Sequence, residues 1–230
     1  MIEEPRALTI RRPSRRPSQA QIDAFRGVPT GIVVDAMDGR GAMAAAIAPL
    51  GPGAPAQMCG PALTADNGPG DVLATFGALA LARPGDVLVA GFGGHQSCAA
   101  AGDRIMGMLR NAGGAGFVTD GPMRDLAGIA AVGLPVWCTG LNPGSPFASG
   151  PGRVGLPVQV GGQMVDAGDM IVGDADGVVV VPWAEIDAVA ARLPRIQELE
   201  AALDAEVAAG RHAPQMVLDL LAGPVVRYVD

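Results

Sequence analysis

The chain has 230 residues, 49% of them hydrophobic, with a formal net charge of −7 and a mean hydropathy of +0.31. Its length suits a single domain with a sizeable core, and it contains no uncharged apolar stretch of the ~18 residues that a membrane span requires. The acidic balance disfavours nonspecific binding of nucleic acid. Three widely spaced cysteines and an acidic start predict neither a disulfide framework nor a signal peptide, so we expect a cytoplasmic protein with no membrane or nucleic-acid partner.

Two residue types are scarce in a way that restricts the chemistry. The chain contains no lysine, since all sixteen basic residues are arginine, and its histidines are His95 and His212. These absences exclude a Schiff base, the lysine of a phosphate-binding loop, and a zinc site with three histidines from one chain. Reaction at a carbonyl group would therefore depend on arginine, on backbone N–H groups, or on a metal held by carboxylates and water.

The first seventeen residues are rich in arginine and proline. This composition predicts an extended or mobile arm over residues 1–17, either a solvated or subunit-clasping segment or a site for an acidic partner. Residues 18–230 are predicted to form one domain. It begins with a helix that is capped by Ser18 and runs to Arg26, followed by a second helix over 31–37.

The middle of the chain predicts alternating strands and helices. Apolar runs indicate strands, and apolar residues at helical spacing indicate helices. The expected strands cover 44–50, 57–65, 87–90, 115–119 and 134–138, and the expected helices cover 71–82, 99–111 and 124–131. From 86 to 138 the order is strand, helix, strand, helix, strand, which predicts parallel strands joined by right-handed crossovers.

After residue 139 the pattern changes to short alternating runs separated by glycine turns, which predicts a β-rich part up to Val181. A helical pattern then runs from Pro182 to Ala209, and Pro194 is expected to kink it or split it into two helices. The glycine-rich loop over 91–94 resembles a dinucleotide-binding turn. The sixth position of that pattern is Gln96 instead of glycine, so the sequence disfavours nucleotide binding at this loop.

The pattern most indicative of a functional site lies between Gly102 and Asp125. Asp103 stands at the start of a predicted helix, and Arg124 and Asp125 follow the end of the next predicted strand. The twenty residues between Asp103 and Arg124 suffice for one helix and one strand, so both ends can meet at one edge of a sheet. A helix N-terminus that faces an arginine and a carboxylate can bind a small anion and a hard metal ion. The alternative is that Arg124 and Asp125 form a helix-capping salt bridge.

Several motifs, taken in order, resemble one protein family. They are Val34-Asp35-Ala36, Cys59-Gly60-Pro61-Ala62-Leu63-Thr64, Pro84-Gly85-Asp86-Val87-Leu88-Val89, the set Asp103…Arg124-Asp125, Gly161-Gly162, Gly168-Asp169 and Gly173-Asp174-Ala175-Asp176-Gly177-Val178. Over roughly residues 27–212, the chain therefore resembles the ribonuclease E inhibitor A-like superfamily, which includes the metal-dependent class II pyruvate aldolases. The nearest activity in that superfamily is 4-hydroxy-4-methyl-2-oxoglutarate / 4-carboxy-4-hydroxy-2-oxoadipate aldolase.

The resemblance implies an α/β fold, namely an α-β-β sandwich with a swivelling β/β/α-type central sheet that is partly parallel, and a long C-terminal helical segment. It implies assembly as a homotrimer or a dimer of trimers. It also implies Mg²⁺ or Mn²⁺ held by Asp125, with Asp103 contacting a metal-bound water. A neighbouring subunit's C-terminal helix would add an acidic residue, and Glu200 best matches that position.

By the same resemblance, the backbone N–H groups of Gly102, Asp103, Arg104 and Ile105 would hold pyruvate, and Arg124 would stabilise the enolate oxygen. The implied function is aldol cleavage of a 4-hydroxy-2-oxoacid to pyruvate and a second oxoacid, with oxaloacetate decarboxylation as a side activity. One alternative is a noncatalytic protein that regulates ribonuclease activity by protein–protein binding. Another is an oxoacid-binding or isomerase-like protein that shares the site.

Overall fold

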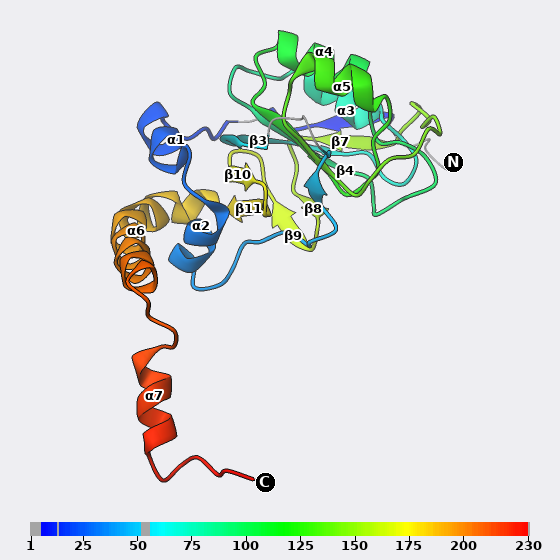
Figure 1. Ribbon diagram of the computed structural model, residues 1–230. Coiled ribbons are helices and arrows are strands. Elements are labelled where there is room, and N and C mark those ends of the chain that lie inside the picture. The colour runs from blue at the N-terminus through cyan, green and yellow to red at the C-terminus, as the bar shows by residue number, and fades with distance from the viewer. Residues whose placement is uncertain (1–5, 13, 52–55, 230) are drawn as a thin grey trace, which may run out of the picture.

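The computed structural model describes residues 6–12, 14–51 and 56–229, which form a layered α/β fold (Figure 1). Helices α3 (Leu73–Leu79), α4 (Asp103–Asn111) and α5 (Leu126–Val132) cover one face of the main sheet. A smaller β layer lies on the other face, followed by the helices of the two chain ends. The α-β-β fold class with a partly parallel sheet and a long C-terminal helix is therefore confirmed.

The main sheet has the strand order β1-β7-β3-β4-β5-β6-β2. Its strands are β1 (Leu8–Ile10), β2 (Ala48–Pro49), β3 (Met58–Asp66), β4 (Val87–Gly91), β5 (Gly116–Thr119), β6 (Val136–Cys138) and β7 (Gly152–Val154). Strands β3, β4, β5 and β6 are mutually parallel, which confirms the parallel arrangement predicted from 86 to 138. The strand expected over 44–50 is shorter than predicted, because only Ala48 and Pro49 pair with β6.

The smaller β layer consists of two hairpins. Strands β8 (Val158–Val160) and β9 (Gln163–Val165) pair with each other, and β10 (Met170–Asp174) pairs with β11 (Gly177–Val181) and with the first half of β3. This layer confirms the β-rich part predicted after residue 139.

The apolar run of β4 shows how the layers are held together. Leu88 and Ala90 belong to the core beneath helices α3, α4 and α5, whereas Val87 and Val89 belong to the core shared with the smaller β layer. Successive strand residues point to opposite faces, so a strand buried on both faces must be apolar throughout. This central strand ends at the edge of the sheet where the candidate site lies.

The N-terminal segment is more closely attached to the sheet than the predicted arm over 1–17 implies. Residues Leu8–Ile10 form β1, which pairs in parallel with β7. Arg11 forms an ion pair with Asp166. Residues 1–5 and 13 of the predicted arm lie outside the described residues. Ser18 caps α1 (Gln19–Phe25) through a capping box, as predicted, and α2 (Thr30–Ala36) follows.

At Pro194 the chain continues as one helix, so of the two expected outcomes the split is wrong and the kink stays a prediction. After a single 3-10 turn at Trp183–Glu185, α6 (Ile186–Ala208) continues through this proline and is not split. Ile186, Val189 and Leu193 are buried against α1, α2, β10 and β11. This packing stabilises the helical conformation up to Leu193, the residue before the proline. An additional helix, α7 (Gln215–Ala222), extends away from the body of the protein (Figure 1). Within the described ranges, no helix has both the length and the apolar character to cross a membrane.

Candidate active site

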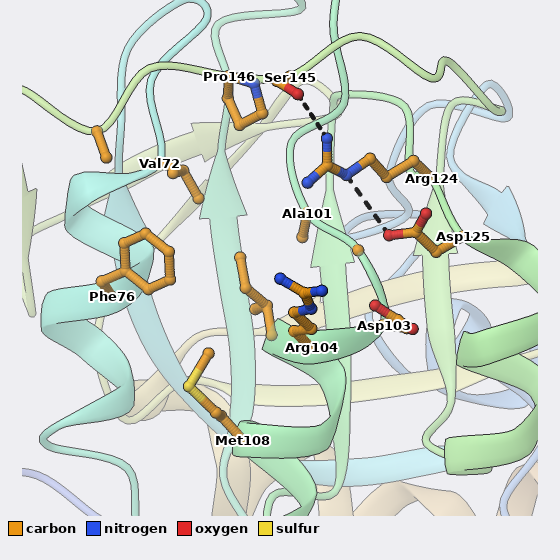
Figure 2. Close-up of a pocket in the computed structure, with 13 residues that line it drawn as sticks. Val72, Phe76, Ala101, Asp103, Arg104, Met108, Arg124, Asp125, Ser145 and Pro146 are labelled. Carbon is orange, nitrogen blue, oxygen red and sulfur yellow. Dashed lines mark hydrogen bonds and ion pairs between the residues drawn. The ribbon is translucent and has the colours of Figure 1, made fainter.

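A cavity of ≈ 520 Å³ lies where α3, α4 and the residues before α5 meet (Figure 2). Its lining combines polar groups from α4 and the Arg124–Asp125 pair with apolar side chains from α3 and α4. The lining residues are Val72, Phe76, Ala101, Gly102, Asp103, Arg104, Ile105, Met108, Arg124, Asp125, Ser145, Pro146 and Ala148. The two ends of the predicted Asp103–Asp125 set therefore share one pocket.

Backbone pairing brings these two ends together. Residues Ala101 and Met123 form a parallel bridge, and the N–H of Arg124 donates to the carbonyl of Ala101 at 3.1 Å. The N–H of Ala100 donates to the carbonyl of Pro122 at 2.7 Å. Because residues 100 and 101 are used in this pairing, the helix expected over 99–111 begins only at Asp103.

Gly102 allows the close approach of the two segments. A Cβ atom at this position would lie 2.5 Å from Oδ2 of Asp125 and 3.1 Å from Cγ of Arg124. Both distances are shorter than ordinary van der Waals contact, so a side chain here would push the Arg124–Asp125 pair away. The glycine is therefore required by the packing of the site.

The N-terminus of α4 provides the anion-binding part of the pocket. Gly102 is the N-cap of this nine-residue helix and offers no side-chain cap, and Asp103, Arg104 and Ile105 form the first turn. The first N–H groups of a helix have no acceptor within the helix, and the helix dipole adds partial positive charge there. All four predicted substrate-binding residues line the cavity, so their N–H groups can receive a carboxylate.

Arg124 and Asp125 lie beside the α4 N-terminus, packed closely against Gly102. Nη1 of Arg124 donates to Oγ of Ser145 at 2.7 Å, and its Nε lies 3.5 Å from Oδ2 of Asp125 (Figure 2). Asp125 occupies the N-cap position of α5, but its side chain makes no capping hydrogen bond. The alternative prediction was a helix-capping salt bridge between Arg124 and Asp125. The ion pair exists, but its N–O distance is long and both side chains are partly exposed, and such pairs contribute little stability.

Ser145 is a site residue that the sequence reasoning missed. It lies in the loop between β6 and β7, whose position depends on the buried carboxylate of Asp71. That carboxylate accepts hydrogen bonds from the N–H groups of Leu73, Ser149 and Gly150. Burial raises the pKa of Asp71, but these hydrogen bonds together outweigh it, so the pKa lies below its usual value. The available sequence signal was an aspartate at the first position of the helix predicted over 71–82. Nothing in the sequence indicated that Ser149 and Gly150 would donate hydrogen bonds to it.

The glycine-rich loop after β4 is held in place by hydrogen bonds to Asp120. Asp120 accepts hydrogen bonds from the N–H groups of Phe92 and Gly94, at 2.5 and 2.8 Å. The side-chain amide of Gln96 donates to the carbonyl of Asp120 at 3.0 Å. Asp120 thus fixes this loop to the end of β5, beside the residues that lead to Arg124.

The metal-binding capacity of the site is limited within one chain. Among the described residues, no group of three or more histidine, cysteine or acidic side chains is placed to hold a metal ion. Asp103 and Asp125 line the cavity, whereas Glu200 is exposed on α6 and does not line it. Mg²⁺ is commonly held by one or two carboxylates while keeping several waters. The two aspartates therefore fit a hydrated Mg²⁺ or Mn²⁺ at Asp125, but not an ion coordinated entirely by this chain.

Comparison with known proteins identifies the class to which this fold and pocket belong. A family model described as RraA-like, Aldolase/RraA, matches residues 30–180. The chain is also 41% identical over 168 residues to a protein of Halalkalibacterium halodurans, with 72% of this chain and 79% of the relative aligned. That relative is named, provisionally, as a 4-hydroxy-4-methyl-2-oxoglutarate aldolase. The chain belongs to the RraA-like family, which confirms the resemblance seen in its motifs.

Solved structures agree with this assignment. A Streptomyces coelicolor protein, described as an unusual member of the RNase ES inhibitor RraA protein family, superposes with a TM-score of 0.73 at 26% identity. The alignment covers 83% of this chain and 100% of that one. An uncharacterized protein from Pseudomonas syringae pv. tomato gives a TM-score of 0.75 at 25% identity, covering 85% of this chain and 92% of the other.

Proposed function

We propose that the chain is a divalent-metal-dependent class II pyruvate aldolase. It would cleave a 4-hydroxy-2-oxoacid, of the 4-hydroxy-4-methyl-2-oxoglutarate or 4-carboxy-4-hydroxy-2-oxoadipate type, into pyruvate and a second oxoacid. The observation that carries this proposal is the convergence of the α4 N-terminus, Arg124 and Asp125 on one cavity of ≈ 520 Å³. The name of the Halalkalibacterium relative supports the same reaction class.

In the proposed reaction each group of the pocket has one role. The 1-carboxylate of the substrate would bind the N–H groups at the start of α4, and the Arg124 guanidinium would stabilise negative charge on the 2-oxo oxygen. Asp103 would accept the C4 hydroxyl proton, directly or through water. The C3–C4 bond then breaks, C4 becomes the carbonyl of the released oxoacid, and the electron pair forms the pyruvate enolate, which takes a proton at C3. A metal at Asp125 would supply Lewis-acid polarisation of the 2-oxo group.

The absence of lysine is consistent with this route. An aldolase that stabilises its enolate through a Schiff base needs a lysine amine, and this sequence has none. The side activity proposed for the same site is decarboxylation of oxaloacetate, because loss of carbon dioxide from C3 leaves the same pyruvate enolate. The N–H groups at the α4 N-terminus and the Arg124 guanidinium suit both reactions.

We also propose that the active site is completed by oligomerisation. Large apolar side chains on the outer part of α6 and on α7 are exposed in the single chain, where they have no core to join. They are Leu199, Leu203, Val207, Met216, Leu220 and Leu221. Burial of this face in a homotrimer or dimer of trimers would remove it from water. Glu200, on the same part of α6, would then reach the pocket of a partner subunit and add a carboxylate there.

The direct test is to supply the purified protein with Mg²⁺, Mn²⁺ or Co²⁺ and to measure pyruvate release with lactate dehydrogenase and NADH. The substrates are 4-hydroxy-4-methyl-2-oxoglutarate, 4-carboxy-4-hydroxy-2-oxoadipate and oxaloacetate. We expect pyruvate from all three, loss of activity with EDTA, and recovery when metal is restored. No pyruvate from any substrate with any of the metals would contradict the aldolase proposal.

The second candidate function is a noncatalytic regulator of ribonuclease activity that acts by protein–protein binding. It is favoured by the structural likeness to the Streptomyces coelicolor member of the RNase ES inhibitor RraA family. The Arg124→Ala variant separates the two functions. If ribonuclease inhibition is present and this variant retains it in full, the regulator function does not use the pocket; the aldolase activity is expected to be lost in the same variant.

A further inference from the structure

The cavity contains a second guanidinium, that of Arg104. Binding of the substrate part that becomes pyruvate does not require it. Arg104 is the second residue of α4, and its side chain points into the pocket (Figure 2). The Arg124 guanidinium already contacts Ser145 and Asp125. Among the residues that the structure describes, the Arg104 side chain forms no hydrogen bond or ion pair, so this cation is available to a ligand.

An apolar wall stands beside Arg104. Met108 follows Arg104 by one turn of α4, so both side chains lie on the same face of the helix. Val72 and Phe76, from the start of α3, face them across the cavity (Figure 2). Phe76 and Met108 remain 39% and 43% exposed in the free chain. The cavity therefore has an anion-binding end at the α4 N-terminus, a separate cation at Arg104, and an uncharged wall between α3 and α4.

We infer that Arg104 is a specificity-determining residue that binds a second carboxylate of the substrate, while the Phe76–Met108 wall receives a small alkyl group at C4. This inference rests on the proposed aldolase function. With the 1-carboxylate at the helix N-terminus, the remaining carboxylate of a 4-hydroxy-2-oxo diacid needs a cation elsewhere in the same cavity. A guanidinium binds a carboxylate through two parallel hydrogen bonds, a geometry that an ammonium cannot reproduce.

The same arrangement ranks the two candidate substrates. One guanidinium and one apolar wall match 4-hydroxy-4-methyl-2-oxoglutarate, which has one distal carboxylate and one methyl group at C4. In 4-carboxy-4-hydroxy-2-oxoadipate the methyl group is replaced by a charged carboxymethyl group. Placing that charge against Phe76 and Met108 without a partner is costly. The wild-type protein is therefore expected to prefer the methyl-substituted diacid.

The kinetic test compares the diacid with 4-hydroxy-4-methyl-2-oxopentanoate, in which the distal carboxylate is replaced by a methyl group. Arg104→Leu is expected to lower kcat/KM for the diacid by about 10- to 100-fold, mainly through KM, and to change it less than about threefold for the monoacid. Arg104→Lys should recover part of the loss. The control is Arg110→Leu, on the same helix, because Arg110 donates to the carbonyl of Val132 outside the pocket. Equal losses on both substrates, or none on either, would overturn the inference.

A binding measurement keeps this inference separate from the aldolase proposal. Calorimetry in the presence of Mg²⁺ compares 2-oxoglutarate with 2-oxopentanoate, which has the same chain length and one carboxylate. Arg104→Leu is expected to weaken 2-oxoglutarate binding at least about tenfold and to leave 2-oxopentanoate unchanged. If the wild type cleaves no substrate but shows this difference, the aldolase proposal fails and the role of Arg104 stands. If 2-oxoglutarate does not bind, or binds equally to the variant, the role of Arg104 is wrong.

Discussion

Asp125 adopts a left-handed backbone conformation, with φ of 63°, and its carboxylate does not cap the helix that follows it. A residue other than glycine in this region is held there by its surroundings, at a cost of roughly 1–3 kcal/mol. The surroundings are visible here, since the N–H of Arg124 bonds the carbonyl of Ala101 and the carboxylate of Asp125 packs closely against Gly102. Such strain is typical of a residue whose side chain must point in one direction, as a metal ligand does.

Asp125→Asn separates the charge of this residue from its conformation. Asparagine tolerates the left-handed region and has the same shape, so we expect the free energy of unfolding to change by less than about 0.5 kcal/mol. We expect binding of Mn²⁺, measured by calorimetry or by electron paramagnetic resonance, to weaken strongly because a neutral amide is a poorer ligand for a hard cation. Unchanged Mn²⁺ affinity would show that the metal does not bind at Asp125.

Gly102→Ala tests the close approach of the two site segments. Its φ of −144° is open to alanine, so the backbone permits the change, but the new Cβ would lie 2.5 Å from Oδ2 of Asp125. We expect a loss of activity of at least about tenfold, since a small displacement of catalytic groups is enough for this. Gly107→Ala is the matched control on the same helix, because nothing lies within 4 Å of its Cβ. It should keep full activity and gain up to about 1 kcal/mol of stability.

At the scale of elements, the loop that carries Ser145 depends on one buried carboxylate. Asp71→Ala removes the acceptor of the Leu73, Ser149 and Gly150 N–H groups, and we expect it to cost about 1–3 kcal/mol of unfolding free energy. The pKa of Asp71 is lowered in the folded state, because its hydrogen bonds outweigh its burial. Its contribution to stability is therefore complete above the unfolded pKa of about 3.9 and is lost as the pH falls through the folded pKa.

The measurement is urea unfolding of the wild type and of Asp71→Ala at pH 7 and at several values below 4. The difference between the two proteins should be largest at pH 7 and should shrink as the pH falls below the unfolded pKa of about 3.9. A difference that stays constant across this range would show that the charge of Asp71 has no part in holding the loop. The control for long-term acid damage is return of each sample to pH 7 before a repeat measurement.

Local patterns predicted the elements of the site better than its long-range contacts. The strand at β4, the helix after it and the position of Arg124 and Asp125 follow from apolar runs and turn residues that are close in the sequence. Ser145 had no such signal, because its role depends on Asp71, which lies 74 positions earlier in the chain. The split expected as one outcome at Pro194 is wrong for a similar reason, since burial of Leu193 and its neighbours keeps the helix continuous through the proline.

At the scale of the whole molecule, the exposed apolar face of α6 predicts that one charged substitution there would weaken the homo-oligomer. Leu203 is 51% exposed in the isolated chain. Leu203→Glu would place a charge within the proposed subunit interface, so we expect a smaller species than the wild type in size-exclusion chromatography with light scattering. Ala201→Glu is the control, because residue 201 is exposed and lies on the other side of the same helix. Identical masses for all three proteins would place the interface elsewhere.

Sharing of the active site between subunits can be tested by complementation. Arg124→Ala lacks the cation proposed to stabilise the enolate, and Glu200→Gln lacks the carboxylate proposed to come from α6 of the partner subunit. Each variant alone should therefore be nearly inactive. Random co-assembly of the two, after co-expression, leaves about one site in four with an intact Arg124 from one chain and an intact Glu200 from another. If Glu200 acted within its own chain, every site would lack one group and mixing would restore nothing. Recovery toward about a quarter of wild-type activity would therefore show that the site is formed by two subunits, whereas full activity of Glu200→Gln alone would remove Glu200 from the mechanism.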